Sequence, residues 1–261
     1  MIRGFFYGES QPKRKRKFAI AIFTASISIF MIFPFDEEYI ATKQVMLGKA
    51  TMNFDFIELA DYINEKFCVK PVNIIYDLID DGATPRLQIC LELEKEALLF
   101  KDAMLNFDRE KQNIVAEKFR EMIESGSMRG DNCSSSSYPL DAYSADSLFV
   151  YFSAFKPVAQ MEFNESVLPQ EVAALKQKLG NNVIWEIIPK FTGVTFFVYT
   201  DKQVREYEDS AEMQRWAAAY FDILEKYDEF GYFEKESFGV FLDSKENFDK
   251  NYDSNWNYYF S

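Results

Sequence analysis

Alternating oxygen-bearing side chains near the C-terminus are the arrangement in this chain that most resembles a metal site. Asp249, Asn251 and Asp253 occupy every second position, as the first ligands of a calcium-binding loop do. The remainder of such a loop is missing, because Ser254 stands where its glycine belongs and Phe260 where its last acidic ligand belongs. These three residues are therefore weak metal candidates, and we expect no tightly bound divalent ion.

The 261-residue chain contains no histidine, which excludes whole classes of catalytic site. A Ser-His-Asp triad, a Cys-His pair, an HExxH zinc site and a histidine proton relay all need that side chain. The cysteines Cys68, Cys90 and Cys133 have no CxxC spacing, so they favour buried free thiols, or one disulfide with a thiol left over, rather than a zinc site. No GxGxxG or GxxxxGK[ST] motif is present, and we expect no cofactor.

Carboxylates alone can carry out hydrolysis without histidine, as the paired acids of glycosidases do. Glu92 with Glu94 on one predicted strand face, and Asp80 with Asp81 in a predicted turn, are pairs of this kind. The chain has 42 acidic residues, however, so neighbouring acids arise by chance and a solvated face explains them more simply. A carboxylate-dependent hydrolase without histidine is therefore the alternative to a non-catalytic binding protein.

Aromatic residues are concentrated at the C-terminus. Trp256, Tyr258 and Tyr259 lie within the last six residues, and residues 186–200 are similarly aromatic-rich. Trp and Tyr are favoured anchors in protein interfaces, so these three residues are candidate partner-binding residues. A tail that docks back on its own body is the favoured competing interpretation.

Charge narrows the class of partner. The formal net charge is -13, which argues against nucleic acid as a partner because phosphate contacts need a basic face. An acidic surface suits a basic protein partner that is met through electrostatic steering. The hydrophobic fraction of 48% is large enough for a sizeable core.

An uncharged block occupies residues 18–35. It follows five basic residues, Lys13 to Lys17, and is closed by the three acids of residues 36–38. At helical rise the block is about 27 Å long, just under a hydrocarbon core of roughly 30 Å. The charge step predicts a membrane anchor with the basic end in the cytoplasm and an extracytoplasmic body. A cleaved secretory signal, or a buried strand or helix of a soluble cytoplasmic protein, remains an alternative.

The remaining chain repeats one order of elements. Helix, hairpin, long helix and strand occur twice, about 105 to 110 residues apart. The predicted hairpins lie near residues 72–93 and 183–199, the short helices at 56–67 and 169–179, the long helices at 101–124 and 203–228, and the last strands at 148–155 and 238–242.

A further strand before each first helix, the first at residues 39–46, would make each half βαββαβ. This order resembles the ferredoxin-like (split βαβ) arrangement, in which two helices cover one sheet. We therefore expect an α+β protein with two tandem ferredoxin-like halves. The predicted divisions are a basic tail and apolar segment at 1–38, a first half at 39–145 and a second half at 146–261. The strand at 148–155 would either close the first half or open the second.

These observations favour a non-catalytic protein-binding module. An inhibitor or immunity-type protein that covers a basic partner is one form of it. An envelope component displayed by the N-terminal helix is another, and the two are compatible.

Overall fold

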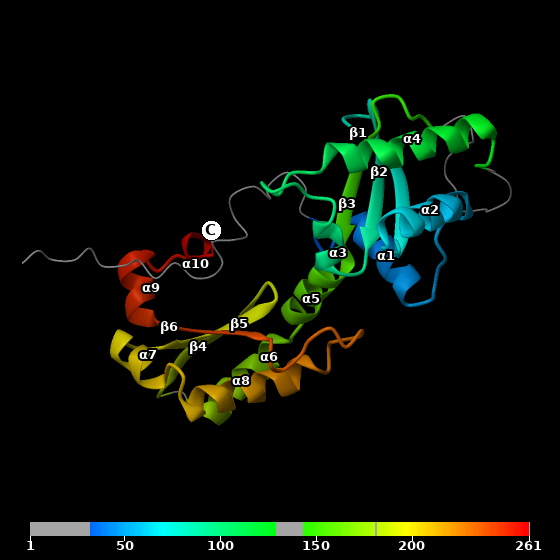
Figure 1. Ribbon diagram of the computed structural model, residues 1–261. Coiled ribbons are helices and arrows are strands. Elements are labelled where there is room, and N and C mark those ends of the chain that lie inside the picture. The colour runs from blue at the N-terminus through cyan, green and yellow to red at the C-terminus, as the bar shows by residue number, and fades with distance from the viewer. Residues whose placement is uncertain (1–31, 129–142, 181, 261) are drawn as a thin grey trace, which may run out of the picture. The chain divides into compact units, whose positions relative to one another are not determined.

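The computed structural model describes residues 32–128, 143–180 and 182–260 (Figure 1). Most of the predicted anchor, up to residue 31, lies outside the described residues. In the part of the chain that is described, no helix combines the length and the apolar character needed to cross a bilayer.

The first sheet contains three strands in the order β1-β2-β3, with bounds Asn73–Ile79, Thr84–Leu91 and Phe149–Ala154. β1 and β2 form the predicted hairpin and are antiparallel, whereas β3 runs parallel to β2. Asp80, Asp81 and Gly82 have positive φ in the hairpin turn, a conformation that glycine adopts freely and that aspartate tolerates better than most residues. β3 therefore closes the first sheet.

The second sheet repeats this topology among the described residues. Its strands β4 (Ile184–Lys190), β5 (Gly193–Val198) and β6 (Gly239–Ser244) lie in the order β4-β5-β6, with β4 antiparallel and β6 parallel to β5. Every residue of β5 is buried, as its β-branched and aromatic composition predicts for a central strand. Both predicted hairpins are confirmed.

In the described residues the two halves share one order of helices, with two α-helices before each hairpin and two between each hairpin and its last strand. In the first half they are α1 (Glu37–Met46), α2 (Ile57–Phe67), α3 (Glu94–Leu98) and α4 (Arg109–Ser125), with a 3₁₀ turn, η2, at Phe54–Phe56. In the second half they are α5 (Phe155–Glu165), α6 (Pro169–Leu179), α7 (Asp201–Tyr207), α8 (Ala211–Leu224), α9 (Lys245–Asn251) and α10 (Trp256–Tyr259).

Capping residues explain where the long helices differ from their predicted bounds. The helix predicted at 101–124 begins only at Arg109, because the Asp108 carboxylate accepts hydrogen bonds from the first-turn amides. The region predicted at 203–228 opens with the expected Thr200 capping box but is divided into α7 and α8. The division occurs where Asp209 is left-handed and Ser210 caps α8. Both regions are mainly helical, as the repeat requires.

The strand expected at 39–46 is a helix instead, and this expectation was wrong. Glu37 and Glu38 lie in the first turn of α1 and Lys43 lies in the last, an arrangement that complements the helix dipole. Its buried residues, Tyr39 and Thr42, are three positions apart, which is a helical and not a strand spacing. The protein is thus α+β with two mixed three-stranded sheets in the described residues, and the ferredoxin-like detail is not confirmed.

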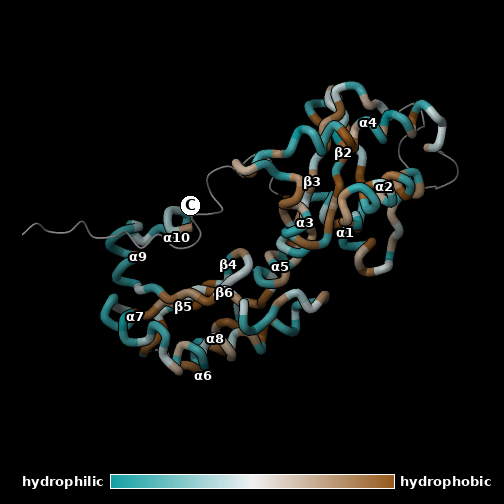
Figure 2. Tube along the Cα trace, in the orientation of Figure 1, coloured by the Kyte–Doolittle hydropathy of each residue, from teal (hydrophilic) through white to brown (hydrophobic). Residues whose placement is uncertain are grey.

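Each sheet has its own hydrophobic cluster. The first packs β1–β3 against α2 and α4, and the second packs β4–β6 against α6 and α8, with Trp216 and Tyr220 of α8 fully buried. Figure 2 shows the strands as mostly hydrophobic, whereas α9 is mostly hydrophilic. A third cluster joins Tyr39 and Cys90 to α5 and to Tyr232. Burial of one such large side chain contributes about 1.5–3 kcal/mol, so these clusters carry most of the stability.

Candidate functional site

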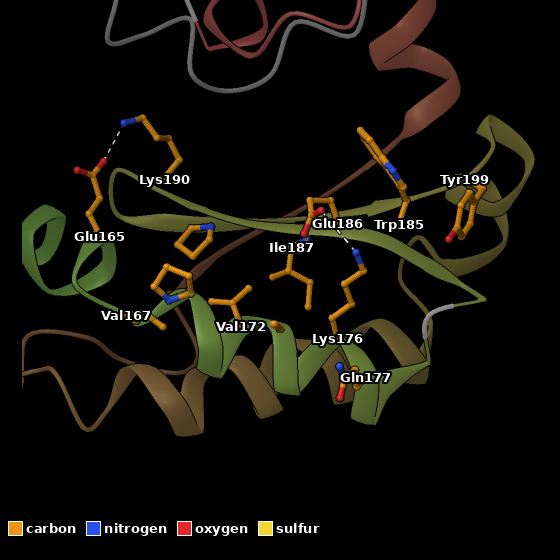
Figure 3. Close-up of a pocket in the computed structure, with 13 residues that line it drawn as sticks. Glu165, Val167, Val172, Lys176, Gln177, Trp185, Glu186, Ile187, Lys190 and Tyr199 are labelled. Carbon is orange, nitrogen blue, oxygen red and sulfur yellow. Dashed lines mark hydrogen bonds and ion pairs between the residues drawn. The ribbon is translucent and has the colours of Figure 1, made fainter.

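A groove of about 810 Å³ lies between α6 and the outer strand β4 (Figure 3). Val172 of α6 and Ile187 of β4 form its floor together with Val167, and all three are buried. Pro169 occupies the first turn of α6, where a missing N–H costs nothing. The lining residues are Glu165, Val167, Pro169, Val172, Ala173, Lys176, Gln177, Trp185, Glu186, Ile187, Pro189, Lys190 and Tyr199.

Two ion pairs border this apolar floor. Lys176 Nζ lies 3.4 Å from Glu186 Oε2, and Lys190 Nζ lies 3.0 Å from Glu165 Oε1. Figure 3 shows the Glu165–Lys190 pair at one end of the groove and the Lys176–Glu186 pair farther along it, with Val172 and Ile187 between the two pairs. All four side chains remain partly exposed, so each pair contributes at most about 1 kcal/mol to stability and its groups remain accessible to a ligand.

A β-bulge determines where the Glu186 side chain points. The pairing of β4 with β5 shifts register between Ile184 and Glu186. Trp185 then extends to the opposite side of β4 from Ile187, as Figure 3 shows, while Glu186 reaches Lys176 on α6. Bulges commonly redirect a side chain in this way beside a binding site.

The outer edge of β4 is poorly suited to accept another strand. The Ile187 N–H donates to Glu186 Oε1 at 3.2 Å, so a side chain already satisfies this edge donor. Pro189 has no N–H to offer. Because strand addition depends on free edge amides, the groove is suited to contacts through side chains.

Asn164 holds the hairpin at one end of the groove. It begins an Asn-X-Ser triplet of the kind that accepts N-glycans, but its side chain is fully buried. Its amide donates to the carbonyls of Phe191 and Gly193 at 3.0 and 2.7 Å, and its oxygen accepts from the Tyr220 hydroxyl at 2.7 Å. A Cβ on Gly193 would lie 2.7 Å from the Gly239 carbonyl oxygen, so the neighbouring strand leaves no room for a side chain there.

The C-terminal aromatic residues pack back on the body beside the groove. Trp256 stacks on Phe248 with ring centroids 4.0 Å apart, and on Trp185, which lines the groove. Tyr259 is buried and Tyr258 is 56% exposed. Their role in partner binding stays a prediction.

A buried carboxylate anchors the end of this tail. The Tyr259 hydroxyl donates to Asp243 Oδ2 at 2.7 Å, and the Asn247 amide and the Ser244 N–H also donate to Asp243. Burial raises the pKa of Asp243, although these donors favour its ionised form. Burial and the neighbouring Asp243 together raise the pKa of Tyr259.

The weak metal candidates are engaged in local contacts. Asp249 accepts from Lys245 Nζ and from the Ser254 hydroxyl, and the Asn251 amide donates to Asn247 Oδ1 at 2.6 Å. Asp253 is in a left-handed turn conformation. Within the described ranges, no group of three or more His, Cys, Asp or Glu side chains is arranged to hold a metal ion.

The predicted carboxylate pair Glu92 and Glu94 does not share a strand face, so that expectation was wrong. β2 ends at Leu91, and Glu94 is the first residue of α3. Leu93 is the N-cap residue of α3, so the chain has left the sheet before it reaches Glu94. Glu92 Oε1 instead accepts from the Tyr232 hydroxyl at 3.0 Å.

The described cysteines are free thiols in different surroundings. Cys68 is exposed, and Cys90 is buried. Burial raises the pKa of the Cys90 thiol to about 11, so it is inert as a nucleophile near neutral pH. Cys133 lies outside the described residues.

Comparison with known proteins gives no relative: no protein-family model, no curated protein and no solved structure matches this chain. The sequence does not reveal the groove, although residues 186–200 are aromatic-rich. Pro189 within a strand pattern was the available signal, because proline in a strand indicates an outer edge.

Proposed function

We propose that this chain is a non-catalytic protein-binding module and that the groove between α6 and β4 receives its partner. The observation that carries the proposal is the combination of a buried apolar floor with accessible ion pairs at its borders. Binding grooves of this kind are mostly apolar, with a few polar groups that fix the orientation of the ligand.

The occupied edge of β4 favours one mode of recognition over another. A partner that inserts side chains from a helix or a loop leaves the Glu186 contact with Ile187 intact, whereas an added strand must displace it. The groove itself carries two lysines and two glutamates and is charge-balanced. The net charge of -13 favours a basic partner through long-range steering, as an inhibitor or immunity-type protein would use.

The chain also carries a membrane anchor in this proposal. Residues 18–35 hold the protein in the bilayer, with Lys13 to Lys17 in the cytoplasm and the described body on the other side. The support is the charge step around the uncharged block.

Two adjacent alanines on α6 allow a matched test of the groove. Ala173 and Ala174 are both exposed, and Ala173 lines the groove whereas Ala174 does not. A photo-crosslinking amino acid is placed at either position in the full chain, which is expressed in its native host and irradiated. We expect a discrete protein adduct from position 173 that is absent from position 174. Equal adducts from both positions, or none from 173, would contradict the proposal.

A further inference from the structure

A second hollow, of about 370 Å³, adjoins the groove at its Glu165–Lys190 end. We call its apolar part the N-terminal patch. It is formed by residues from three separate parts of the chain. They are Phe33, Pro34, Phe35, Met161 and Phe191, with Glu162, Glu165, Ser166 and Lys190 also lining the hollow.

The patch stands directly at the end of the uncharged block. Phe33 and Phe35 stack with ring centroids 5.3 Å apart, and Phe35 is 74% exposed. The Phe33 N–H donates to Asp36 Oδ2 at 2.7 Å, and the Asp36 N–H donates to the Phe33 carbonyl at 3.0 Å. α1 then begins at Glu37. This tight turn leaves no linker between the block and the folded body.

Because the connection between the block and α1 is so short, the body must lie close to any membrane that holds the block. A residue spans at most about 3.6 Å, so Asp36, the one residue between the block and α1, covers a distance smaller than the headgroup region. We infer that the N-terminal patch rests on the bilayer surface, with Phe35 and Phe191 at headgroup depth. This inference rests on the proposed anchor and adds which face of the body meets the lipid.

Phe191 is the member of the patch that tests the inference best. It is far from the uncharged block in the sequence, so its place in the patch is not a consequence of being next to the block along the chain. It forms the turn between β4 and β5, in left-handed conformation, and its carbonyl is fixed by the Asn164 amide. The Phe191 side chain is half-buried, and Lys190 Nζ lies 4.8 Å from the centre of its ring. An aromatic ring at a turn beside a lysine suits the apolar edge of the membrane interface.

Charge at the rim indicates the kind of lipid surface. Glu162 pairs with Lys43 at 2.8 Å, Lys43 also pairs with Glu229 at 2.7 Å, and Glu165 pairs with Lys190, so the rim has no excess of positive charge to attract anionic lipid. Contact with a zwitterionic bilayer therefore requires no anionic lipid and has little dependence on salt. The same contact places the Glu165–Lys190 end of the groove next to the membrane, where a partner would be met.

Lipid photo-crosslinking of the full chain tests the inference. A benzoylphenylalanine is placed at Phe35 or Phe191, and the protein is reconstituted into phosphatidylcholine vesicles. Matched controls carry the probe at Met104, which is also 74% exposed, or at Leu78, beside the turn of the corresponding hairpin in the first half. We expect at least about fivefold more lipid adduct from positions 35 and 191 than from the two controls.

Three results would overturn the inference. Equal lipid adducts at positions 191 and 78 would mean that no particular face meets the bilayer. Adducts from position 191 to residues 18–31 of the same chain would mean that the block covers the patch. A full chain that does not associate with the vesicles would remove the anchor together with this inference, yet it would leave the protein adduct expected at Ala173 unaffected.

Discussion

Trp185 and Trp256 lie with ring centroids 5.8 Å apart and planes only 12° from parallel, so a groove residue is stacked on the C-terminal tail. Phe248 contacts both rings from α9. The tail therefore packs where Trp185 extends, on the side of β4 opposite Ile187, and loss of the tail affects both stability and the position of Trp185.

Removal of the Trp256 ring should destabilise the protein. Trp256→Ala deletes a partly buried aromatic side chain whose ring contacts five other aromatic rings, and we expect a loss of about 2–3 kcal/mol in the free energy of unfolding. Tyr258→Ala is the control, because this side chain is largely exposed, and it should cost less than about 0.5 kcal/mol. Urea unfolding monitored by circular dichroism measures both, and equal losses would contradict the packing described.

The buried Asp243 carboxyl, which accepts a hydrogen bond from Tyr259, should make the free energy of unfolding depend on pH in a defined direction. Because burial raises the folded-state pKa of Asp243 above that of the unfolded chain, the folded protein gains stability as pH falls through that pKa. Tyr259→Phe removes a donor that favours the ionised carboxylate, so its cost should be greatest near pH 7, at about 1–3 kcal/mol, and should decline at lower pH.

Urea unfolding of wild type and Tyr259→Phe at several pH values measures this dependence. In an Asp243→Asn background the same substitution should have a cost that no longer changes with pH. A cost that rises as pH falls, or one that still varies in the Asn background, would show that Asp243 is not the group responsible.

Glu186 should protect the outer edge of β4 from association with other chains. Glu186→Ala frees the Ile187 N–H and breaks the ion pair with Lys176, so we expect faster aggregation, measured by light scattering. Glu186→Gln keeps a carbonyl oxygen that can accept from the same N–H, and it should aggregate nearly as slowly as wild type. If the two variants aggregate equally fast, the lost charge and not the freed amide is the cause.

The sequence predicted the elements that local signals define. Helix α6 was expected with its bounds, because Pro169 and Gly180 mark its two ends, and both hairpins were expected from their turn residues. The helix at 37–46 was mistaken for a strand, because its burial depends on contacts such as Tyr39 with Phe155, which only the tertiary structure brings together.

The groove depends even more on such distant contacts. Lys176 and Glu186 are ten residues apart, the first on a helix and the second on a strand. A β-bulge directs Glu186 toward Lys176, and no local sequence motif predicts this bulge. Glu165 reaches Lys190 across 25 residues. Spacing in the sequence therefore could not reveal the groove, although a proline in a strand indicated the open edge.

The most direct measurement of the central claim is quantitative co-purification from the native host with the full chain and two arginine variants. Ala173→Arg fills the groove with a long charged side chain, whereas Ala174→Arg places the same side chain on the neighbouring exposed position of α6. Both variants should unfold within about 0.5 kcal/mol of wild type, since both sites are exposed in a helix. We predict that wild type and Ala174→Arg each co-purify with a stoichiometric amount of one protein partner. Ala173→Arg should recover at least about tenfold less of that partner, as expected when an interface centre is blocked. The same proteins in equal amounts with all three chains, or no stoichiometric protein with any of them, would contradict the account.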